Sequence, residues 1–151
     1  MSEELLVIIQ IAGRRCALPA LAVRSVIELA AIAPIPRAPA HITGIAALRS
    51  QALTVIDCRR ALGLAAEEWP TDHRAVVVAQ DGHAYALRVD GIEDITSAIG
   101  APGQVPGGFG AEWSRAARGL IETQIGPALL LDPAVLIAGS ELARSESEAA
   151  A

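Results

Sequence analysis

Residues 17–57 read ALPALAVRSVIELAAIAPIPRAPAHITGIAALRSQALTVID, and this stretch decides how the chain can fold. Two strand-length apolar segments, residues 41–49 and 52–57, lie at its end, and the pair Ser50-Gln51 between them is typical of a tight turn. Residues 20–29 fit two structures, a helical turn opened by Pro19 or a strand lined by valine and isoleucine. The stretch therefore predicts short strands joined by short turns.

Three prolines interrupt the same stretch. Pro34, Pro36 and Pro39 exclude regular structure from residues 33–40, apart from edge or extended pieces, because proline fixes φ and has no N–H to donate. We expect a connecting passage there, followed by the strand of residues 41–49.

Strands are also expected on both sides of this stretch. Residues 5–11 (LLVIIQI) are an apolar run of strand length, residues 12–15 form a turn, and residues 16–19 start the next strand. Asp81-Gly82 favours a hairpin turn, since this pair readily adopts the positive φ that such turns need. Beyond residue 57 we expect one helical turn at 59–64, a polar loop at 65–73, strands at 74–79, 84–89, 92–95, 119–121 and 127–132, a loop at 100–110 and a disordered tail at 141–151.

The two halves of the chain carry the same order of features. The turn at Ala12-Gly13 corresponds to Asp81-Gly82 at an offset of about 69 residues, and two further anchors repeat at an offset of about 75. These anchors are Gly44-Ile45 with Gly119-Leu120, and residues 55–57 (VID) with residues 130–132 (LLD). A repeat of this length indicates an internal duplication, in which Gly44 and Gly119 occupy equivalent places. Many short strands with frequent turns favour barrels or sandwiches.

Composition limits the class of protein. The chain has 151 residues, enough for one domain, with 52% hydrophobic, 3% aromatic and 19% charged residues and a mean hydropathy of +0.41. Low charge with high hydrophobicity excludes simple disorder. The net charge is −5, and all twelve basic residues are arginines that form no basic cluster. Nucleic acid and anionic membranes are therefore not expected as partners.

The cysteines and the apolar runs bear on location. Cys16 and Cys58 form no CxxC motif, and of a disulfide, a redox pair or two buried free thiols we expect the free thiols. Residues 1–4 are acidic where a signal peptide is basic, and no apolar run reaches the roughly 18 residues of a membrane span. We expect a soluble cytoplasmic protein without membrane insertion.

No pattern of catalytic or metal-binding residues is present. His41, His73 and His83 have no partner at metal-ligand spacing, and we interpret them as solvated loop histidines. Three aspartates each end an apolar run before a turn: Asp57, Asp90 and Asp132. A pair of them could serve as general acid and base, but such an Asp more often accepts hydrogen bonds from the turn that follows it. The glycine-rich residues 102–110 lack the lysine of a phosphate-binding loop, so we expect no enzyme, cofactor or metal.

Surface residues remain as candidates for partner binding. Arg49 ends an apolar strand next to a turn, and it is either an ordinary solvated residue or a contact for a partner. Val23, Val26 and Ile35 are either core residues or the lining of a groove between subdomains that accepts an amphipathic helix. Spacing alone leaves both alternatives open.

The ordered series of segments resembles the CheW-like family, which comprises the chemotaxis coupling protein CheW and the CheW-like domain at the end of the histidine kinase CheA. The matching segments are residues 17–57, VDGIEDI (89–95) and GLIETQIGPALLLD (119–132), and they anchor the chain from Leu5 to about Ile137. The resemblance implies an all-β fold of two pseudo-symmetric, SH3-like five-stranded β-barrels packed together. Residues 1–140 would be one CheW-like domain with two intertwined barrel subdomains, whose boundary lies near residues 65–75 and whose strands can cross over.

The same resemblance implies a non-catalytic adaptor that couples chemoreceptors to CheA in bacterial chemotaxis and that is a monomer when free. Its partners would be the regulatory domain of CheA and the cytoplasmic tip of methyl-accepting chemoreceptors. The receptor-binding residues implied by the motifs are Arg49, Val23, Val26 and Ile35. The implied kinase-binding residues are Gly44, Leu53 and Val55. A plain backbone requirement for glycine explains Gly44 equally well.

The chain departs from the family pattern at several places, among them Asp57-Cys58, where the family has Asp-Leu. Ser25 stands where the V-x-E-V motif of the family has glutamate. Residues 47–50 read ALRS where the family has N-L-R-G, so Ala47 replaces the asparagine and Ser50 replaces the glycine. Ser25 and Ser50 lie in or near surfaces that the family uses for partners. They favour, as an alternative, a CheW paralogue for a non-flagellar pathway such as surface motility or biofilm signalling, or one that competes for the kinase. A third alternative, a ligand-binding or enzymatic barrel, would need a polar pocket with convergent titratable groups.

Overall fold

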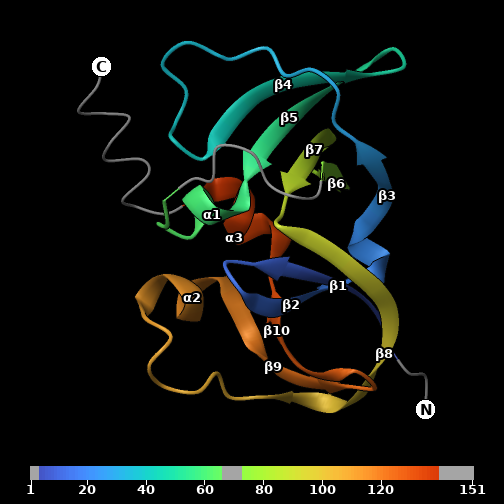
Figure 1. Cartoon of the computed structure of the whole chain (residues 1–151), viewed down its shortest axis with the longest axis vertical. Helices are drawn as coiled ribbons and strands as arrows, with labels where there is room; N and C mark the ends of the chain where they lie inside the picture. Colours follow the sequence, from blue (N-terminus) through green and yellow to red (C-terminus); the bar gives the residue numbers. More distant parts are fainter. Residues whose placement is uncertain (1–3, 66–72, 140–151) are drawn as a thin grey trace.

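The computed structural model describes residues 4–65 and 73–139. The expected tail at 141–151, and residues 66–72 of the expected polar loop and domain boundary, lie outside the described residues. The described chain forms short strands, turns and short helices (Figure 1). In chain order the elements are β1 (Leu5–Ile11), β2 (Arg14–Pro19), η1 (Ala20–Ala22), β3 (Val23–Glu28), β4 (Ile42–Leu48), β5 (Gln51–Asp57), α1 (Cys58–Ala61), β6 (Arg74–Gln80), β7 (His83–Arg88), β8 (Gly91–Gly103), α2 (Ala111–Ala116), β9 (Ala117–Thr123), β10 (Gly126–Leu131) and α3 (Pro133–Ala138). None of these helices has the length and apolar character that crossing a membrane requires.

The strands form two five-stranded sheets. The first is a closed barrel with the order β1-β2-β10-β9-β8, and the second has the order β3-β6-β7-β5-β4. Each sheet therefore takes a hairpin from one half of the chain and three strands from the other half. Parallel contacts join the two parts of each sheet, with Ala17 of β2 opposite Leu130 of β10 and Ile56 of β5 opposite Leu87 of β7. The expected all-β fold of two five-stranded units is confirmed.

The repeated turns and aspartates occupy equivalent places in the two halves. The β1–β2 and β6–β7 hairpins turn at Ala12-Gly13 and Asp81-Gly82, and all four residues have positive φ, as two-residue hairpin turns require. Asp57 and Asp132 precede α1 and α3, and each accepts a 3.0 Å hydrogen bond from a backbone N–H of the helix that follows. The predicted role of these two aspartates in the following turn is thus confirmed.

Gly44 on β4 and Gly119 on β9 are also equivalent, as the duplication predicts. A Cβ atom at Gly44 would collide with the carbonyl oxygen of Ala33, and one at Gly119 would collide with the carbonyl oxygen of Gly103. In each case the neighbouring backbone passes so close to the strand that only glycine fits. The two glycines therefore mark the same seam in each half of the duplication.

The two sheets differ in how this seam is closed. In the barrel, the 13-residue β8 continues to Gly103 and pairs there with Leu120 of β9. In the second sheet β3 ends at Glu28, and only Ala33 reaches β4, where it exchanges two backbone hydrogen bonds of 2.8 Å with Ile45. The seam between β3 and β4 is therefore bridged at one place only.

The core is continuous because the central strands are buried on both faces. Side chains alternate along a strand, so Ile8 of β1 points into the barrel while Ile9 joins the apolar cluster between the sheets. In the same way Val77 of β6 lies inside the second sheet, and Val76 joins the cluster between the sheets. Burial of both faces explains why residues 5–11 and 74–79 are near-continuous apolar runs instead of alternating patterns.

Several boundaries differ from those expected. The β4–β5 turn is Arg49-Ser50, one residue earlier than predicted, and residues 14 and 15 already belong to β2. Gly100–Gly103 continues β8 instead of starting a loop, because strand pairing uses backbone groups that glycine also has. The alternative left open at residues 20–29 resolves into both structures, the single turn η1 and then β3. Helices α2 and α3, six residues each, are too short for a helical period to show in the sequence.

Candidate functional site

A groove lies between the two sheets, where β3 and β8 run on the same side of the molecule (right in Figure 1). Its volume is about 410 Å³, and Val23, Ser25 and Val26 of β3 line one wall while residues 92–95 of β8 line the other. Val26 is 42% exposed and Ile95 is 62% exposed, although both side chains are apolar. We refer to this cavity as the groove.

The two walls of the groove are equivalent parts of the duplication. At the hairpin offset of about 69 residues, residues 23–26 (VRSV) correspond to residues 92–95 (IEDI). Each segment has a β-bulge at its second residue, since Arg24 is extra opposite β6 and Glu93 is extra opposite β1. Bulges redirect the neighbouring side chains. Each wall therefore presents an apolar residue at either end, with Ser25 between them on β3 and Glu93 and Asp94 between them on β8.

Exposed apolar side chains continue beyond the groove. Leu5 at the start of β1, Leu21 on η1 and Ile99 on β8 are all exposed. Leu5 precedes Val7, a groove residue, by two positions, so strand alternation places it on the same face. Leu5 therefore extends the apolar surface of the groove, and exposed apolar surface of this kind marks sites of interaction with other molecules.

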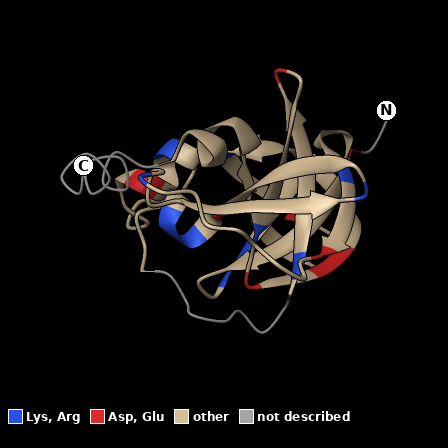
Figure 2. Cartoon of the chain, turned by 90° about the horizontal axis from the view of Figure 1, so that it is seen from above, with Lys and Arg blue, Asp and Glu red and all other residues tan. Residues whose placement is uncertain are grey.

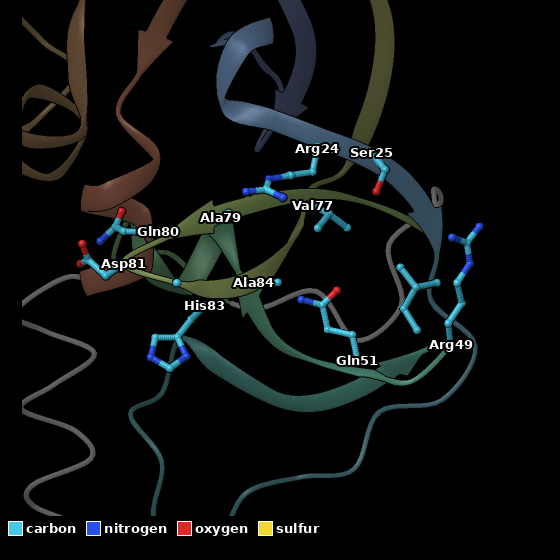
Figure 3. Close-up of a pocket in the computed structure, with 12 residues that line it drawn as sticks. Arg24, Ser25, Arg49, Gln51, Val77, Ala79, Gln80, Asp81, His83 and Ala84 are labelled. Carbon is cyan, nitrogen blue, oxygen red and sulfur yellow. The ribbon is translucent and has the colours of Figure 1, made fainter.

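A second cavity, which we refer to as the mouth, lies at the hairpin end of the second sheet (Figure 3). Its volume is about 480 Å³, and its lining comes from β3, the β4–β5 turn and the β6–β7 hairpin. The polar side chains of this lining include Arg24, Ser25, Arg49, Gln51, Asp81 and His83. Ser25 lines both the mouth and the groove, so the two cavities adjoin at this residue.

Two arginines give the mouth its electrostatic character. Arg24 and Arg49 are exposed, and neither forms an ion pair with any residue in the described part of the chain. The φ of Arg49 is 57°, in the left-handed region, and its side chain extends from the β4–β5 turn toward β3 (Figure 3). Charged residues are sparse over the ribbon as a whole (Figure 2). Two unpaired guanidinium groups in one cavity therefore make this the natural place for a negatively charged partner group.

The residues expected at a receptor surface are largely brought together. Val23 and Val26 line the groove, and Arg49 lines the mouth that adjoins it. Val23 is half-buried and also packs against the cluster between the sheets, so the two alternatives for this residue, core and groove, both hold. Ile35 lies in the proline-rich segment after β3 and lines neither cavity.

The residues expected at a kinase surface are buried. Leu53 and Val55 are 0% exposed and lie in the apolar cluster inside the second sheet, and Gly44 is buried at the seam. These three residues pack the sheet from within, so none of them exposes a side chain to a partner, and their role in kinase binding stays a prediction. The outward-facing positions of the same sheet region are Ile45, which is partly exposed, and Ala47.

The described residues show no constellation for metal binding. No group of three or more His, Cys, Asp or Glu side chains that could hold a metal ion occurs within residues 4–65 and 73–139. His41 is only 2% exposed, and its Nε2 lies 2.8 Å from the carbonyl oxygen of Ile137 at the end of α3. The interpretation as a solvated loop histidine is therefore wrong for His41, whereas His73 and His83 are exposed as expected.

The two cysteines are free and buried in the cluster between the sheets, as expected. Burial raises the pKa of the Cys16 thiol to about 12. Burial, followed by the negative charge of Asp57, raises the pKa of Cys58 as well. Because the thiolate is the nucleophilic form of cysteine, neither sulfur is suited to nucleophilic catalysis.

Sequence reasoning missed the β8 wall of the groove and the role of Arg24. The signal that could have revealed the wall is the hairpin offset, which superimposes residues 92–95 on the residues already suspected on β3. No signal in the sequence predicts the bulges, because they depend on pairing with β1 and β6. Arg24 could therefore not be placed in a cavity from the sequence.

Comparisons with known proteins agree with this geometry. The CheW-like domain profile matches residues 5–141. The chemotaxis protein CheW of Rhizobium meliloti (strain 1021) is 36% identical over 76 residues, which are 50% of this chain and 48% of that protein, so the match spans about half the length of this relative. The crystal structure of the scaffolding protein TtCheW from Thermoanaerobacter tengcongensis has the same fold, with a TM-score of 0.76 and 22% identity over 87% of this chain and 90% of that one. The matched profile spans both sheets and both walls of the groove, and the chain belongs to the CheW-like family.

Proposed function

We propose that the protein is a non-catalytic adaptor that couples chemoreceptors to the histidine kinase CheA in bacterial chemotaxis. The observation that carries the proposal is the groove, in which the exposed apolar side chains of Val26 and Ile95 flank the junction of two sheets. A concave apolar groove of this kind fits one face of an amphipathic helix. Membership of the CheW-like family supports the same role. We assign the protein to the cytoplasm, as a monomer when free.

The cytoplasmic tip of a methyl-accepting chemoreceptor is the partner that we assign to the groove. A helical tip would place apolar side chains at helical spacing against Val26 of β3 and Ile95 of β8. Arg49 lies in the adjoining mouth and would meet polar groups of the same tip, since its planar guanidinium can donate several hydrogen bonds at once. The receptor surface would thus extend from the groove into the mouth.

The regulatory domain of CheA is the partner that we assign to the open edge and the outer face of β4. β4 is an edge strand of the second sheet, and the bridge from Ala33 covers it only at Ile45. Ala47, two residues further on, directs its backbone groups to the same open edge. Edge strands with open backbone groups pair readily with partner chains, and Ile45 adds an exposed apolar side chain. The buried Gly44, Leu53 and Val55 would support this face from within.

Substitutions in the groove test the receptor assignment. Val26→Asp and Ile95→Asp should each weaken binding of a receptor signalling fragment by about tenfold or more, because a carboxylate would lose its hydration in an apolar contact. Binding of the CheA regulatory domain should change by less than about twofold. Isothermal titration calorimetry against each fragment measures both. Ile125→Asp is the matched control, since Ile125 is 38% exposed at the β9–β10 turn and lines neither the groove nor the mouth. Unchanged receptor affinity in both groove variants would contradict the proposal.

A second candidate function rests on Ser25 and Ser50. These residues replace the glutamate and glycine of the family pattern, and Ser25 lines both cavities. They favour a CheW paralogue that serves a non-flagellar pathway, such as surface motility or biofilm signalling, or one that competes for the kinase. Calorimetric titration against receptor fragments from the flagellar and the non-flagellar arrays of one cell distinguishes the two functions. Tighter binding to the flagellar fragment would exclude the paralogue function.

A further inference from the structure

Ser25 occupies the point where the groove opens into the mouth, and a β-bulge puts Arg24 beside it. Along a regular strand, neighbouring side chains point to opposite faces. Here Val23 pairs with Val78 and Ser25 pairs with Val77, so Arg24 is the extra residue of a bulge. As a result Arg24 and Ser25 line the same cavity. A partner segment lying in the groove can therefore reach both residues across the rim of the mouth.

The mouth carries unbalanced positive charge. Arg24 and Arg49 line it without an ion pair to any residue of the described ranges, and Asp81, on the β6–β7 hairpin turn, is the one carboxylate in its lining. A glutamate at position 25, as in the family pattern, would place a carboxylate in the same cavity as the two guanidinium groups. Serine leaves that position neutral. The mouth of this chain is thus complementary to a carboxylate that comes from outside.

We propose that a partner segment seated in the groove carries an acidic side chain that enters the mouth beside Ser25 and is held there by Arg24 and Arg49. Ser25 is then a residue that determines partner specificity, because its lack of charge leaves both arginines open to the partner. This inference rests on the proposed adaptor function and adds the chemistry of the partner to it. The partner that fits is a protein helix with an acidic residue next to its apolar face. A helix without that residue binds more weakly.

A first experiment needs no partner. In Ser25→Glu, the introduced carboxylate would lie in the field of Arg24 and Arg49, so its pKa, measured by NMR titration, should lie below the usual value of about 4.3 for glutamate. Adding Arg49→Gln to this variant should raise that pKa again. An ordinary pKa in Ser25→Glu would overturn the proposal, because it would show that the arginines do not act on this position.

A second experiment measures specificity. Ser25→Glu should weaken binding of a chemoreceptor signalling fragment by about tenfold, because the internal carboxylate competes for the arginines. The neutral variant Ser25→Gln should bind like the parent. So should Gln124→Glu, which adds the same charge at the β9–β10 turn, the barrel's equivalent of the β4–β5 turn. The parent's affinity should also fall as salt rises, and more steeply than that of Ser25→Glu. Equal binding by the parent and Ser25→Glu would overturn the inference alone. No binding by the parent to a receptor fragment or to the CheA regulatory domain would overturn the proposed function, and this inference with it.

Discussion

Arg59 and Asp90 form a two-pronged ion pair that joins the two halves of the chain. The Nε of Arg59 donates to both carboxylate oxygens of Asp90 at 2.9 and 3.0 Å, and its Nη2 donates to Oδ2 at 2.7 Å. The same Oδ2 accepts a hydrogen bond from the backbone N–H of Ala12 at 2.6 Å. One carboxylate thus ties together α1, the start of β8 and the β1–β2 turn. This role exceeds the local turn interaction that the sequence suggested for Asp90.

Acid should weaken this junction. Burial alone would raise the pKa of Asp90, but the hydrogen bonds from Arg59 and Ala12 and the charge of Arg59 outweigh it and hold the pKa below its ordinary value of 3.8. A carboxylate with a lowered pKa in the folded state stabilises above its unfolded pKa, and this contribution disappears as the pH falls through the folded pKa. We expect Asp90→Asn to lower the free energy of unfolding at pH 7 by about 1–3 kcal/mol. In urea titrations the difference from the parent should shrink below about pH 4, and a difference independent of pH would contradict this account.

The seam glycines should be equally intolerant of a side chain. Gly44→Ala and Gly119→Ala each force a Cβ into a backbone carbonyl oxygen, and backbone cannot yield as a flexible side chain does. We expect each substitution to cost about 1–3 kcal/mol of stability, measured by urea denaturation. Gly107→Ala is the control, because a Cβ at Gly107 meets nothing within 4 Å. A large loss at Gly44 with none at Gly119 would contradict the equivalence of the two seams.

The buried thiols should be inert in the folded protein. Burial raises the pKa of Cys16 to about 12 and holds the pKa of Cys58 well above its ordinary value. Neither cysteine should therefore react with a thiol reagent such as dithionitrobenzoate at pH 8. Both should react once the chain is unfolded in guanidinium. Stoichiometric reaction of the native protein would show that the cluster between the sheets opens on the timescale of the assay.

Local patterns predicted most of the strands, because a strand buried on both faces needs a continuous apolar run and a tight hairpin needs residues that accept positive φ. Residues 5–11 and 74–79 show the first signal, and Asp81-Gly82 shows the second. The duplication was also visible, since glycines at the seams and aspartates before α1 and α3 recur for steric and hydrogen-bonding reasons that do not depend on the partner strand.

Features that depend on long-range pairing could not be predicted. The exchange of hairpins between the halves brings β1 and β2 to β8–β10, and no local pattern records which strand a hairpin joins. The groove inherits this problem, because its walls on β3 and β8 become neighbours only through the exchange. The burial of Leu53 and Val55 has the same cause. Which face of β5 is covered depends on the curvature of the second sheet, which brings residues of β4, β6 and β7 over that face.

Arg49 gives the most direct test of the receptor surface. Its exposed side chain has no ion pair in the described part of the chain, so Arg49→Ala should change the free energy of unfolding by no more than about 0.5 kcal/mol. A charged hydrogen bond lost from a desolvated contact costs about 1.5–3 kcal/mol, so receptor binding should weaken by about tenfold to more than a hundredfold. Binding of the CheA regulatory domain should change much less.

The left-handed φ of Arg49 supplies a control for strain. Arg49→Ala keeps a Cβ at φ 57°, whereas Arg49→Gly removes both the guanidinium and the cost of that conformation. If the guanidinium contacts the receptor, both variants should bind the receptor fragment equally weakly in calorimetric titration, although the glycine variant melts at the same or a higher temperature. If instead binding follows stability, so that only Arg49→Ala is impaired, Arg49 acts through the turn. Parental receptor affinity in both variants would make it an ordinary solvated residue, because a guanidinium in contact with the receptor cannot be removed without loss of affinity.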